Sequence, residues 1–191
     1  MNFIENIFTQ LEAAGATSII VELREGGRVT ANGQQLLERI AKARAFIASQ
    51  NLQPGSRCAL LAPNSIDWVA VDLAIMAEGL IVVPLYSRQA PAELVAMMKD
   101  CSPSLICCAS EELRDGILQS WPDAPPQFLF KEIFSGSASV SGNPKLQNSD
   151  PVAVIYTSGT SGEAKGVILT SGNLDHMLRC TSGRLDVLME G

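Results

Sequence analysis

The sequence contains a single histidine, His176, among its 191 residues. Histidine is the commonest ligand of zinc and the usual base of a nucleophilic triad, but one imidazole identifies neither kind of site. His176 falls in a helix that we expect over residues 172–189, so we assign it a surface or capping role. The sequence therefore gives no indication of a catalytic triad or of a zinc centre.

Charged residues are also scarce. They make up 18% of the chain, against about 25% in a typical soluble domain. The net charge is −6 and no basic stripe runs along the sequence, which argues against a nucleic-acid partner because phosphate backbones are bound by clustered lysine and arginine. The low charge has two interpretations that stay equally open: a compact, slightly apolar domain, or a surface that packs against something outside the chain.

Paired cysteines, a leader segment and a long apolar run are missing as well. Five cysteines, an odd number without a C-x-x-C pair, predict buried free thiols in a reducing cytoplasm rather than disulfides or a metal site. The N-terminus lacks the basic and apolar regions of a signal peptide, and the apolar zone over residues 68–85 is interrupted by Asp72, Glu78 and Pro84, which argues against a bilayer span. We therefore expect a cytoplasmic protein. The cysteines are Cys58, Cys101, Cys107, Cys108 and Cys180.

The chain does contain a regular alternation of strand and helix patterns. With 47% hydrophobic residues it is long enough for one ordinary domain with a real core. Short apolar strands alternating with helices predict an α/β fold with a largely parallel sheet flanked by helices. The predicted strands cover residues 18–23, 58–62, 80–85, 105–108 and 127–130, and the predicted helices cover residues 3–14, 34–49, 65–77, 91–99 and 111–119. Ser65 is the predicted N-cap of the helix over residues 65–77. Residues 135–149 are expected to form an exposed loop.

The most informative segment runs from Tyr156 to Gly166 and reads Y-T-S-G-T-S-G-E-A-K-G. Apolar runs at residues 152–155 and 167–169 flank it, so we expect a loop of small residues between two buried strands. Glycines let a backbone approach an anion closely, and hydroxyl and N–H groups donate hydrogen bonds without bulk. Lys165 adds a positive charge that can reach a terminal phosphate. The segment is predicted to bind phosphate; the alternative is a surface hairpin with a solvated lysine.

The order of residues distinguishes this segment from a P-loop. A Walker A loop reads G-x-x-x-x-G-K-[ST] and opens a helix, whereas Lys165 is followed by Gly166 and a strand-like run. The segment closely resembles the phosphate-loop signature of the adenylate-forming superfamily, which includes acyl-CoA synthetases and other AMP-dependent ligases, luciferases and peptide-synthetase adenylation domains. That signature reads Y-T-S-G-T-T-G-x-P-K-G-V. The matching residues are Tyr156, Thr157, Ser158, Gly159, Thr160, Gly162, Lys165, Gly166 and Val167.

Three positions depart from the family pattern. Ser161 stands where threonine is usual and keeps a hydroxyl, whereas Ala164 stands where proline is usual and loses only loop stiffness. Ser171 stands where many members have histidine, so no carboxylate-side role is carried over to it. Residues 63–68 and 79–86 resemble the strand, buried helix and V-P-L strand that precede the loop in this family. The resemblance extends from about residue 34 to residue 174.

The resemblance implies a function that the residues alone do not. Enzymes of this superfamily join a carboxylate to AMP, release pyrophosphate, and commonly pass the acyl group to a thiol. Residues 1–191 would be the N-terminal part of the large domain, with the phosphate loop at 156–166. The later parts, which hold adenine, the acyl group and a C-terminal domain with a catalytic lysine, would be absent. The implied cofactors are ATP with Mg²⁺, whose protein ligands are not recognisable here, and CoA or a carrier-protein thiol as acceptor.

The resemblance also implies roles for eight cofactor-binding residues, whereas no catalytic or metal-binding residue is assigned. An anionic carboxylate must attack an anionic phosphate, so donors that hold the triphosphate and stabilise the leaving charge are needed. The hydroxyl donors would be Thr157, Ser158, Thr160 and Ser161. Gly159 and Gly162 would allow backbone contact, Lys165 would supply positive charge, and Gly166 completes the set.

Several alternatives stay open at this stage. The V-P-L-Y and G-V-I-L-T runs look most like fatty acyl-CoA synthetases, and a peptide-synthetase adenylation domain is the nearest rival. We expect the chain alone to be inactive, with at most weak phosphate affinity, and to associate with itself through an exposed apolar surface. A hypothesis of another class is a non-catalytic module that binds a phosphate or nucleotide, or another protein.

Overall fold

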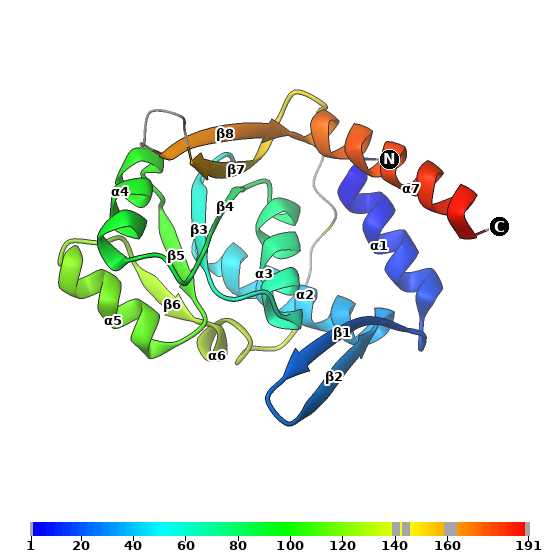
Figure 1. The fold of residues 1–191 in the computed structure, drawn as a ribbon, viewed down its shortest axis with the longest axis horizontal. Helices are drawn as coiled ribbons and strands as arrows, with labels where there is room; N and C mark the ends of the chain where they lie inside the picture. The colour runs from blue at the N-terminus through cyan, green and yellow to red at the C-terminus, as the bar shows by residue number, and fades with distance from the viewer. Residues whose placement is uncertain (1, 139–141, 143–145, 159–163, 190–191) are drawn as a thin grey trace.

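A six-stranded sheet forms the centre of the computed structural model, which describes residues 2–138, 142, 146–158 and 164–189 (Figure 1). The strand order is β6-β5-β3-β4-β7-β8; the first five strands are parallel and β8 runs antiparallel to β7. This arrangement confirms the predicted α/β fold. The strands are β3 (Arg57–Leu61), β4 (Ile81–Leu85), β5 (Leu105–Cys108), β6 (Gln127–Leu129), β7 (Pro151–Ser158) and β8 (Ala164–Thr170).

Helices cover both faces of this sheet. α1, α2, α3 and α6 contribute to the core on one face, and α4 and α5 contribute to the core on the other. α7 follows β8 and lies beside α1, while β1 and β2 form a separate antiparallel hairpin (Figure 1). The bounds are α1 Phe3–Ala14, β1 Ser18–Arg24, β2 Gly27–Asn32, α2 Gly33–Ser49, α3 Ile66–Ala77, α4 Pro91–Cys101, α5 Glu111–Ser120, α6 Phe130–Ile133 and α7 Ser171–Met189.

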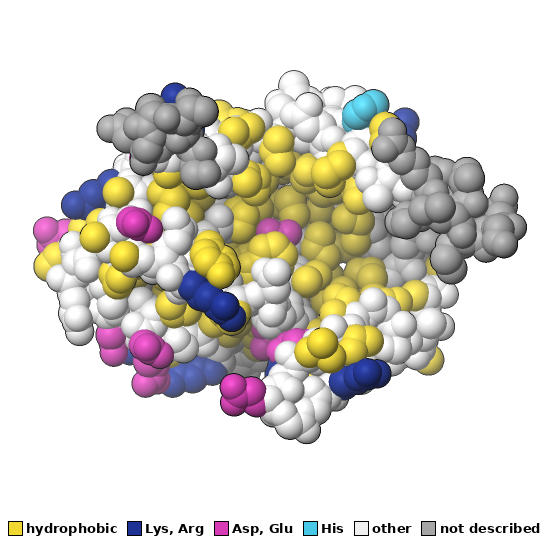
Figure 2. Space-filling view, viewed as in Figure 1, with side chains coloured by type: hydrophobic (Ala, Val, Ile, Leu, Met, Phe, Trp, Pro, Cys, Tyr) yellow, Lys and Arg dark blue, Asp and Glu magenta, His cyan; other side chains and the backbone are white. Residues whose placement is uncertain are grey.

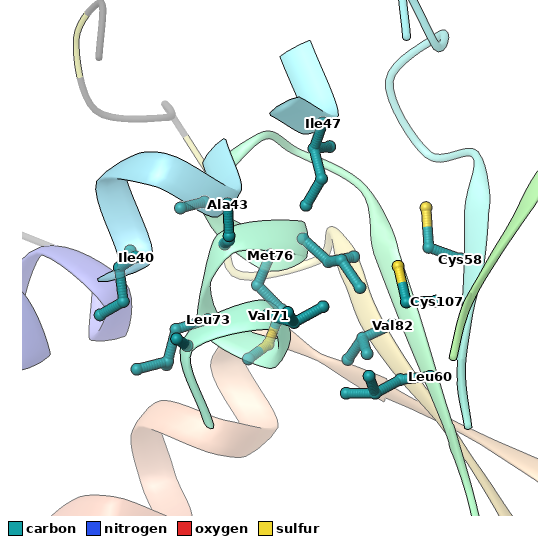
Figure 3. Close-up of a cluster of buried hydrophobic side chains, with 14 of the residues drawn as sticks. Ile40, Ala43, Ile47, Cys58, Leu60, Val71, Leu73, Met76, Val82 and Cys107 are labelled. Atoms are coloured by element: carbon teal, nitrogen blue, oxygen red, sulfur yellow. The ribbon is translucent and has the colours of Figure 1, made fainter. Parts of the chain in front are cut away.

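The central strands are apolar throughout because both of their faces are covered. In β3, Cys58 and Leu60 belong to the cluster under α2 and α3, whereas Ala59 and Leu61 belong to the cluster under α4 and α5. Figure 3 shows the first cluster, in which side chains of α2 and α3 meet those of the strands. Each large aliphatic side chain buried in this way contributes about 1.5–3 kcal/mol, so these two clusters are the main source of stability.

The start of α3 is fixed by two oxygen acceptors. The first N–H groups of a helix have no partner within it. Ser65 Oγ accepts from the Trp68 N–H at 3.0 Å, which confirms Ser65 as the predicted N-cap. The Glu22 carboxylate, on β1, accepts from the Ile66 N–H at 3.0 Å. The β1–β2 hairpin is thereby attached to the N-terminal end of α3, the helix that follows β3.

The elements predicted over residues 3–130 have boundaries within two residues of those observed, and the region after β6 differs in kind. The strand expected over residues 127–130 ends at Leu129, because Phe130 begins the short helix α6, which the sequence did not predict. The Glu132 carboxylate accepts from the Leu129 N–H at 2.6 Å and closes that turn. Residues 135–138 are exposed, as expected of the loop over 135–149, but residues 139–141 and 143–145 of that loop lie outside the described residues.

All five cysteines are free, and four of them are buried as predicted. Burial raises the pKa of the Cys58 and Cys108 thiols to about 12. Cys180 corrects the prediction, because it lies exposed on α7. Among the described helices, none combines the length and the apolar character that a bilayer crossing needs.

Candidate phosphate-binding site

The β7–β8 hairpin carries the predicted phosphate loop. Its register pairs Tyr156 with Gly166, Thr157 with Lys165, and Ser158 with Ala164, so both strands extend further into segment 156–166 than the sequence indicated. The expectation that residues 167–169 form a buried strand is wrong, because β8 lies at the edge of the sheet and is mostly exposed. Directly paired residues of an antiparallel ladder share a face. The exposed side chains of Thr157 and Lys165 are thus brought together at the loop-bearing end.

The remaining predicted site residues are placed only in part. Ser158 ends β7 and is described by its backbone position. Gly159, Thr160, Ser161 and Gly162 lie outside the described residues. The predicted roles of these four residues stay predictions. The described part of the site is therefore the pair of strand ends that enter and leave the loop.

Gly166 is required by packing at the strand pair. A Cβ atom at this position would lie 2.9 Å from Val154 Cγ1 and 3.3 Å from Tyr156 Cζ. Carbon atoms rarely approach this closely, so the missing side chain of Gly166 makes room for the tyrosine ring across the hairpin. The sequence indicated Gly166 as a cofactor-binding residue; its described contacts give it a structural role.

The Tyr156 hydroxyl connects this hairpin to α4. Its Oη atom lies 3.0 Å from the Met97 carbonyl oxygen and 2.5 Å from Asp100 Oδ2, and both oxygens are acceptors. Burial and the hydrogen bond to Asp100 raise the pKa of the Tyr156 hydroxyl, so it stays protonated at neutral pH and acts as the donor. Sequence reasoning missed this contact because Met97 and Asp100 are 59 and 56 residues away in the chain.

A cleft of about 700 Å³ lies between α4 and the hairpin. Its α4 wall includes the carboxylates of Glu93 and Asp100, and its hairpin wall includes Tyr156 and Thr157. Lys165, paired with Thr157, brings the opposite charge to the hairpin side. Lys165 itself is not among the described residues that line the cleft. The lining residues are Pro84, Leu85, Tyr86, Gln89, Glu93, Ala96, Met97, Asp100, Tyr156, Thr157 and Ala164.

A second cleft, of about 510 Å³, lies at the carboxyl ends of β3 and β4. α3 leaves β3 toward one face of the sheet and α4 leaves β4 toward the other, so a crevice forms between the two loops. Ligands of open α/β sheets bind at such a switch point. Asn64 from the first loop and Arg88 from the second line it, with Trp68 of α3, which also packs against the core. The sequence indicated that both loops follow buried strands, but it did not give the strand order that brings the two loops together.

His176 and Glu111 are not among the residues that line either cleft. His176 is exposed on α7, with Nε2 at 3.6 Å from Cys180 Sγ. Glu111 lies in the first turn of α5 and pairs with Lys131 at 2.5 Å, which lowers the pKa of the Glu111 carboxyl. No group of three potential metal ligands occurs among the described histidine, cysteine, aspartate and glutamate side chains.

One perturbed carboxyl lies on α3 and lines neither cleft, although Trp68, one turn away, lines the second. Burial raises the pKa of Asp72 to about 7. Its helix neighbours one turn away, Trp68, Val69 and Met76, are apolar, and no hydrogen bond or ion pair of Asp72 is found in the described parts of the chain. Asp72 is therefore a candidate for pH-dependent stability rather than for phosphate binding.

Comparison with known proteins gives a consistent set of relatives. A model of the family described as AMP-binding enzyme matches residues 9–188. The 2-succinylbenzoate–CoA ligase of Bacillus cytotoxicus is 31% identical over 72% of this chain and 27% of that protein. The fumosorinone synthetase of Cordyceps fumosorosea is 30% identical over 83% of this chain and 4% of that protein. The chain thus spans about a quarter or less of the length of these two relatives.

Solved structures share the fold at lower identity. A fatty acyl-adenylate ligase from L. pneumophila, in complex with acyl adenylate and pyrophosphate, matches with a TM-score of 0.80 and 18% identity over 93% of this chain and 32% of that one. The O-succinylbenzoate coenzyme A synthetase from Bacillus subtilis, in complex with AMP, matches with a TM-score of 0.74 and 19% identity over 95% of this chain and 45% of that one. Both likenesses concern the arrangement of helices and strands described above.

Proposed function

The chain belongs to the AMP-binding enzyme family, and from that premise we propose that it supplies the phosphate-binding part of an ATP-dependent ligase. A protein that combines this chain with the regions its relatives carry in addition would join a carboxylic acid to AMP, release pyrophosphate, and pass the acyl group to a thiol. The observation that carries the proposal is the hairpin register, which sets Lys165 opposite Thr157 beside the 700 Å³ cleft.

The described residues fit a triphosphate on chemical grounds. The Thr157 hydroxyl is a hydrogen-bond donor, and the Lys165 ammonium is a compact positive charge on an exposed strand end. Together they would hold the β- and γ-phosphates on the side of the cleft away from the α4 carboxylates. The same donors would stabilise the charge that accumulates on departing pyrophosphate. Mg²⁺ would neutralise part of the polyphosphate charge, and we assign no ligand for it in this chain.

We also propose a class of acid substrate and of thiol acceptor. The V-P-L-Y and G-V-I-L-T runs favour a fatty acid, and a long-chain-fatty-acid–CoA ligase of Mycobacterium bovis is among the relatives, at 26% identity. A carrier-protein thiol is the alternative to CoA, because a hybrid PKS-NRPS synthetase of Aspergillus flavus is 31% identical over 87% of this chain. In a protein that combines this chain with the further regions of its relatives, ATP–pyrophosphate exchange with fatty, aromatic and amino acids in parallel would identify the acid class.

The binding role is tested with the 191-residue chain itself. We expect Lys165→Ala to weaken binding of Mg²⁺-ATP about tenfold or more, because it removes a charge that contacts phosphate. Lys131→Ala is the matched control, since Lys131 is an exposed lysine on α6. Titration followed by NMR detects affinities in the millimolar range. Equal affinity of the Lys165→Ala variant and the wild-type chain would contradict the assignment.

Catalysis is tested separately from binding. We propose that the isolated chain has no turnover, so carboxylate-dependent exchange of pyrophosphate into ATP by the 191 residues alone would overturn that part of the proposal. Calorimetry tests the alternative of a non-catalytic module. A tight, saturable nucleotide complex of the isolated chain would favour the module over the ligase part.

An exposed apolar surface supports the proposal that the chain packs against further protein. Figure 2 shows hydrophobic side chains gathered over a hollowed region between β8 and the β1–β2 hairpin. Ile168 of β8, Met177 of α7 and Leu23 of β1 are 62%, 53% and 77% exposed. Isolated chains would bury such groups against one another. Sedimentation that shows a monomer at all concentrations would contradict self-association.

A further inference from the structure

The loop-bearing end of the β7–β8 hairpin extends beyond the parallel ladder. The register between β4 and β7 is a single pair, Val82 with Ala153. From Val154 onward, β7 pairs with β8 alone in the described chain, and most of β8 is exposed. β4 and β7 stay side by side, and contacts in addition to the sheet also stabilise this end.

The Tyr156 side chain provides such a contact between the hairpin and α4. Its ring occupies the space left by Gly166 on β8, and its hydroxyl reaches the Met97 carbonyl and the Asp100 carboxylate on α4. A short O–H···O hydrogen bond to an ionised carboxylate is among the stronger hydrogen bonds in proteins. One side chain thus links both strands of the hairpin to the opposite wall of the cleft.

We propose that Tyr156 is a positioning residue for the strand ends that carry Thr157 and Lys165, and that its hydrogen bond to Asp100 fixes the distance between the hairpin and α4. This inference rests on the proposed function, because it concerns the same cleft. The Tyr156 hydroxyl contacts protein atoms of α4, so it would affect phosphate binding through the position of these strand ends. A phosphate chain held between Thr157 and Lys165 then meets donors that are already in position, and binding does not have to order them.

The experiment separates the hydroxyl from the ring. Tyr156→Phe keeps the aromatic packing over Gly166 and removes only the hydrogen bonds to α4. Asp100→Asn keeps an oxygen acceptor and removes the charge. Asp115→Asn, on the exposed surface of α5, is the matched control for losing a carboxylate. Two readouts are needed: hydrogen exchange of the β7 and β8 amides compared with those of β3, and the Kd for inorganic tripolyphosphate with Mg²⁺, followed by NMR.

We expect Tyr156→Phe to speed exchange of the β7 and β8 amides about tenfold and to weaken tripolyphosphate binding three- to tenfold, which corresponds to about 0.7–1.4 kcal/mol. Exchange of β3 should not change. Asp100→Asn should speed exchange of the same amides by a smaller factor and is read by exchange alone, because it also removes a negative charge that disfavours an anion, and Asp115→Asn should change neither readout. The double variant Tyr156→Phe, Asp100→Asn should be no worse than Tyr156→Phe, because both changes remove one interaction.

Two results would overturn the inference in distinguishable ways. Wild-type binding of tripolyphosphate that Tyr156→Phe leaves unchanged would overturn the positioning role and leave the proposed function intact. A wild-type chain that does not bind tripolyphosphate would overturn the proposed phosphate site and the positioning role together. Faster exchange in β3 as well as in the hairpin would show a general loss of stability, and it would also count against a specific positioning role.

Discussion

The middle of the sheet and its β7–β8 end are held by different kinds of interaction. β3 and β5 are buried between helices on both faces, so their stability comes from many apolar contacts and does not depend on one polar contact. At the loop-bearing end of β7 and β8, the Tyr156 hydroxyl is hydrogen-bonded to the Asp100 carboxylate and its ring fills the space beside Gly166. The comparison teaches that the rigid part of this fold is generic, while the part that is proposed to bind phosphate is held by few, specific contacts.

The largest expected effect comes from the middle of the sheet. Leu60 on β3 is fully buried, and Leu60→Ala would leave a cavity between the sheet and α3. We expect a loss of about 3–5 kcal/mol in the free energy of unfolding, measured by urea denaturation followed by circular dichroism. A loss below about 1 kcal/mol would show that the core collapses around the deletion and is less rigid than described.

A smaller effect on the free energy of unfolding is expected from the ionisation of Asp72, whose helix packs on the middle of the sheet. Because the folded pKa, about 7, lies above the ordinary value of 3.8, the folded state binds the proton more tightly than the unfolded state. The resulting stabilisation is complete below the unfolded pKa and is lost as the pH rises from about 4 to 7. We expect a decrease on the order of 2–4 kcal/mol over that window.

Asp72→Asn provides the control for this pH dependence. The amide does not titrate, so the unfolding free energy of the variant should vary less between pH 4 and pH 7 than that of the wild-type chain. Urea denaturation at several pH values measures both. Parallel pH profiles of the two proteins would contradict the assignment to Asp72.

Gly166→Ala tests the hairpin side of the comparison. The added methyl group would meet Val154 and the Tyr156 ring, so we expect a cost of about 1–3 kcal/mol together with displacement of the tyrosine from α4. Hydrogen exchange should show the loosening in β7 and β8 before it shows any in β3. An unchanged hairpin would mean that the strands can separate slightly without cost.

The smallest effect on the free energy of unfolding is expected from a substitution on the exposed side of β8. Ile168 is 62% exposed, so Ile168→Ala should change the unfolding free energy by less than about 0.5 kcal/mol in the isolated chain. The same denaturation measurement applies. A larger loss would indicate that Ile168 is covered in solution, for instance by a second copy of the chain, and sedimentation would then show an oligomer that the variant lacks.

The generic part of the fold could be predicted from the sequence and the specific part could not. Apolar runs such as residues 58–61 identify buried strands because burial on both faces requires them, and Ser65 was recognisable as a helix cap from local pattern. The contact of Tyr156 with Asp100 depends on the strand order and on the place of α4, which no local pattern contains. The crevice near Arg88 was missed for the same reason. The short helix α6 was missed because four residues are too few for a periodic signal.

The site residues themselves were predicted from a resemblance rather than from physics. Small residues and one lysine between apolar strands indicate an anion loop; the described chain pairs Thr157 with Lys165, and their binding role stays a prediction. Gly166 shows the limit of this reasoning, because its described contacts are with the tyrosine ring across the hairpin. A glycine in a motif can be required by its neighbours in space as well as by a ligand.

The outer edge of β8 has a consequence for handling the protein. In the described chain this strand has a neighbour on one side only, so its unpaired backbone groups can template the addition of foreign strands and the growth of aggregates. A charge on such an edge acts as a gatekeeper against this process. Lys165 is placed to serve in that way too, and its replacement by alanine would lower solubility as well as anion affinity.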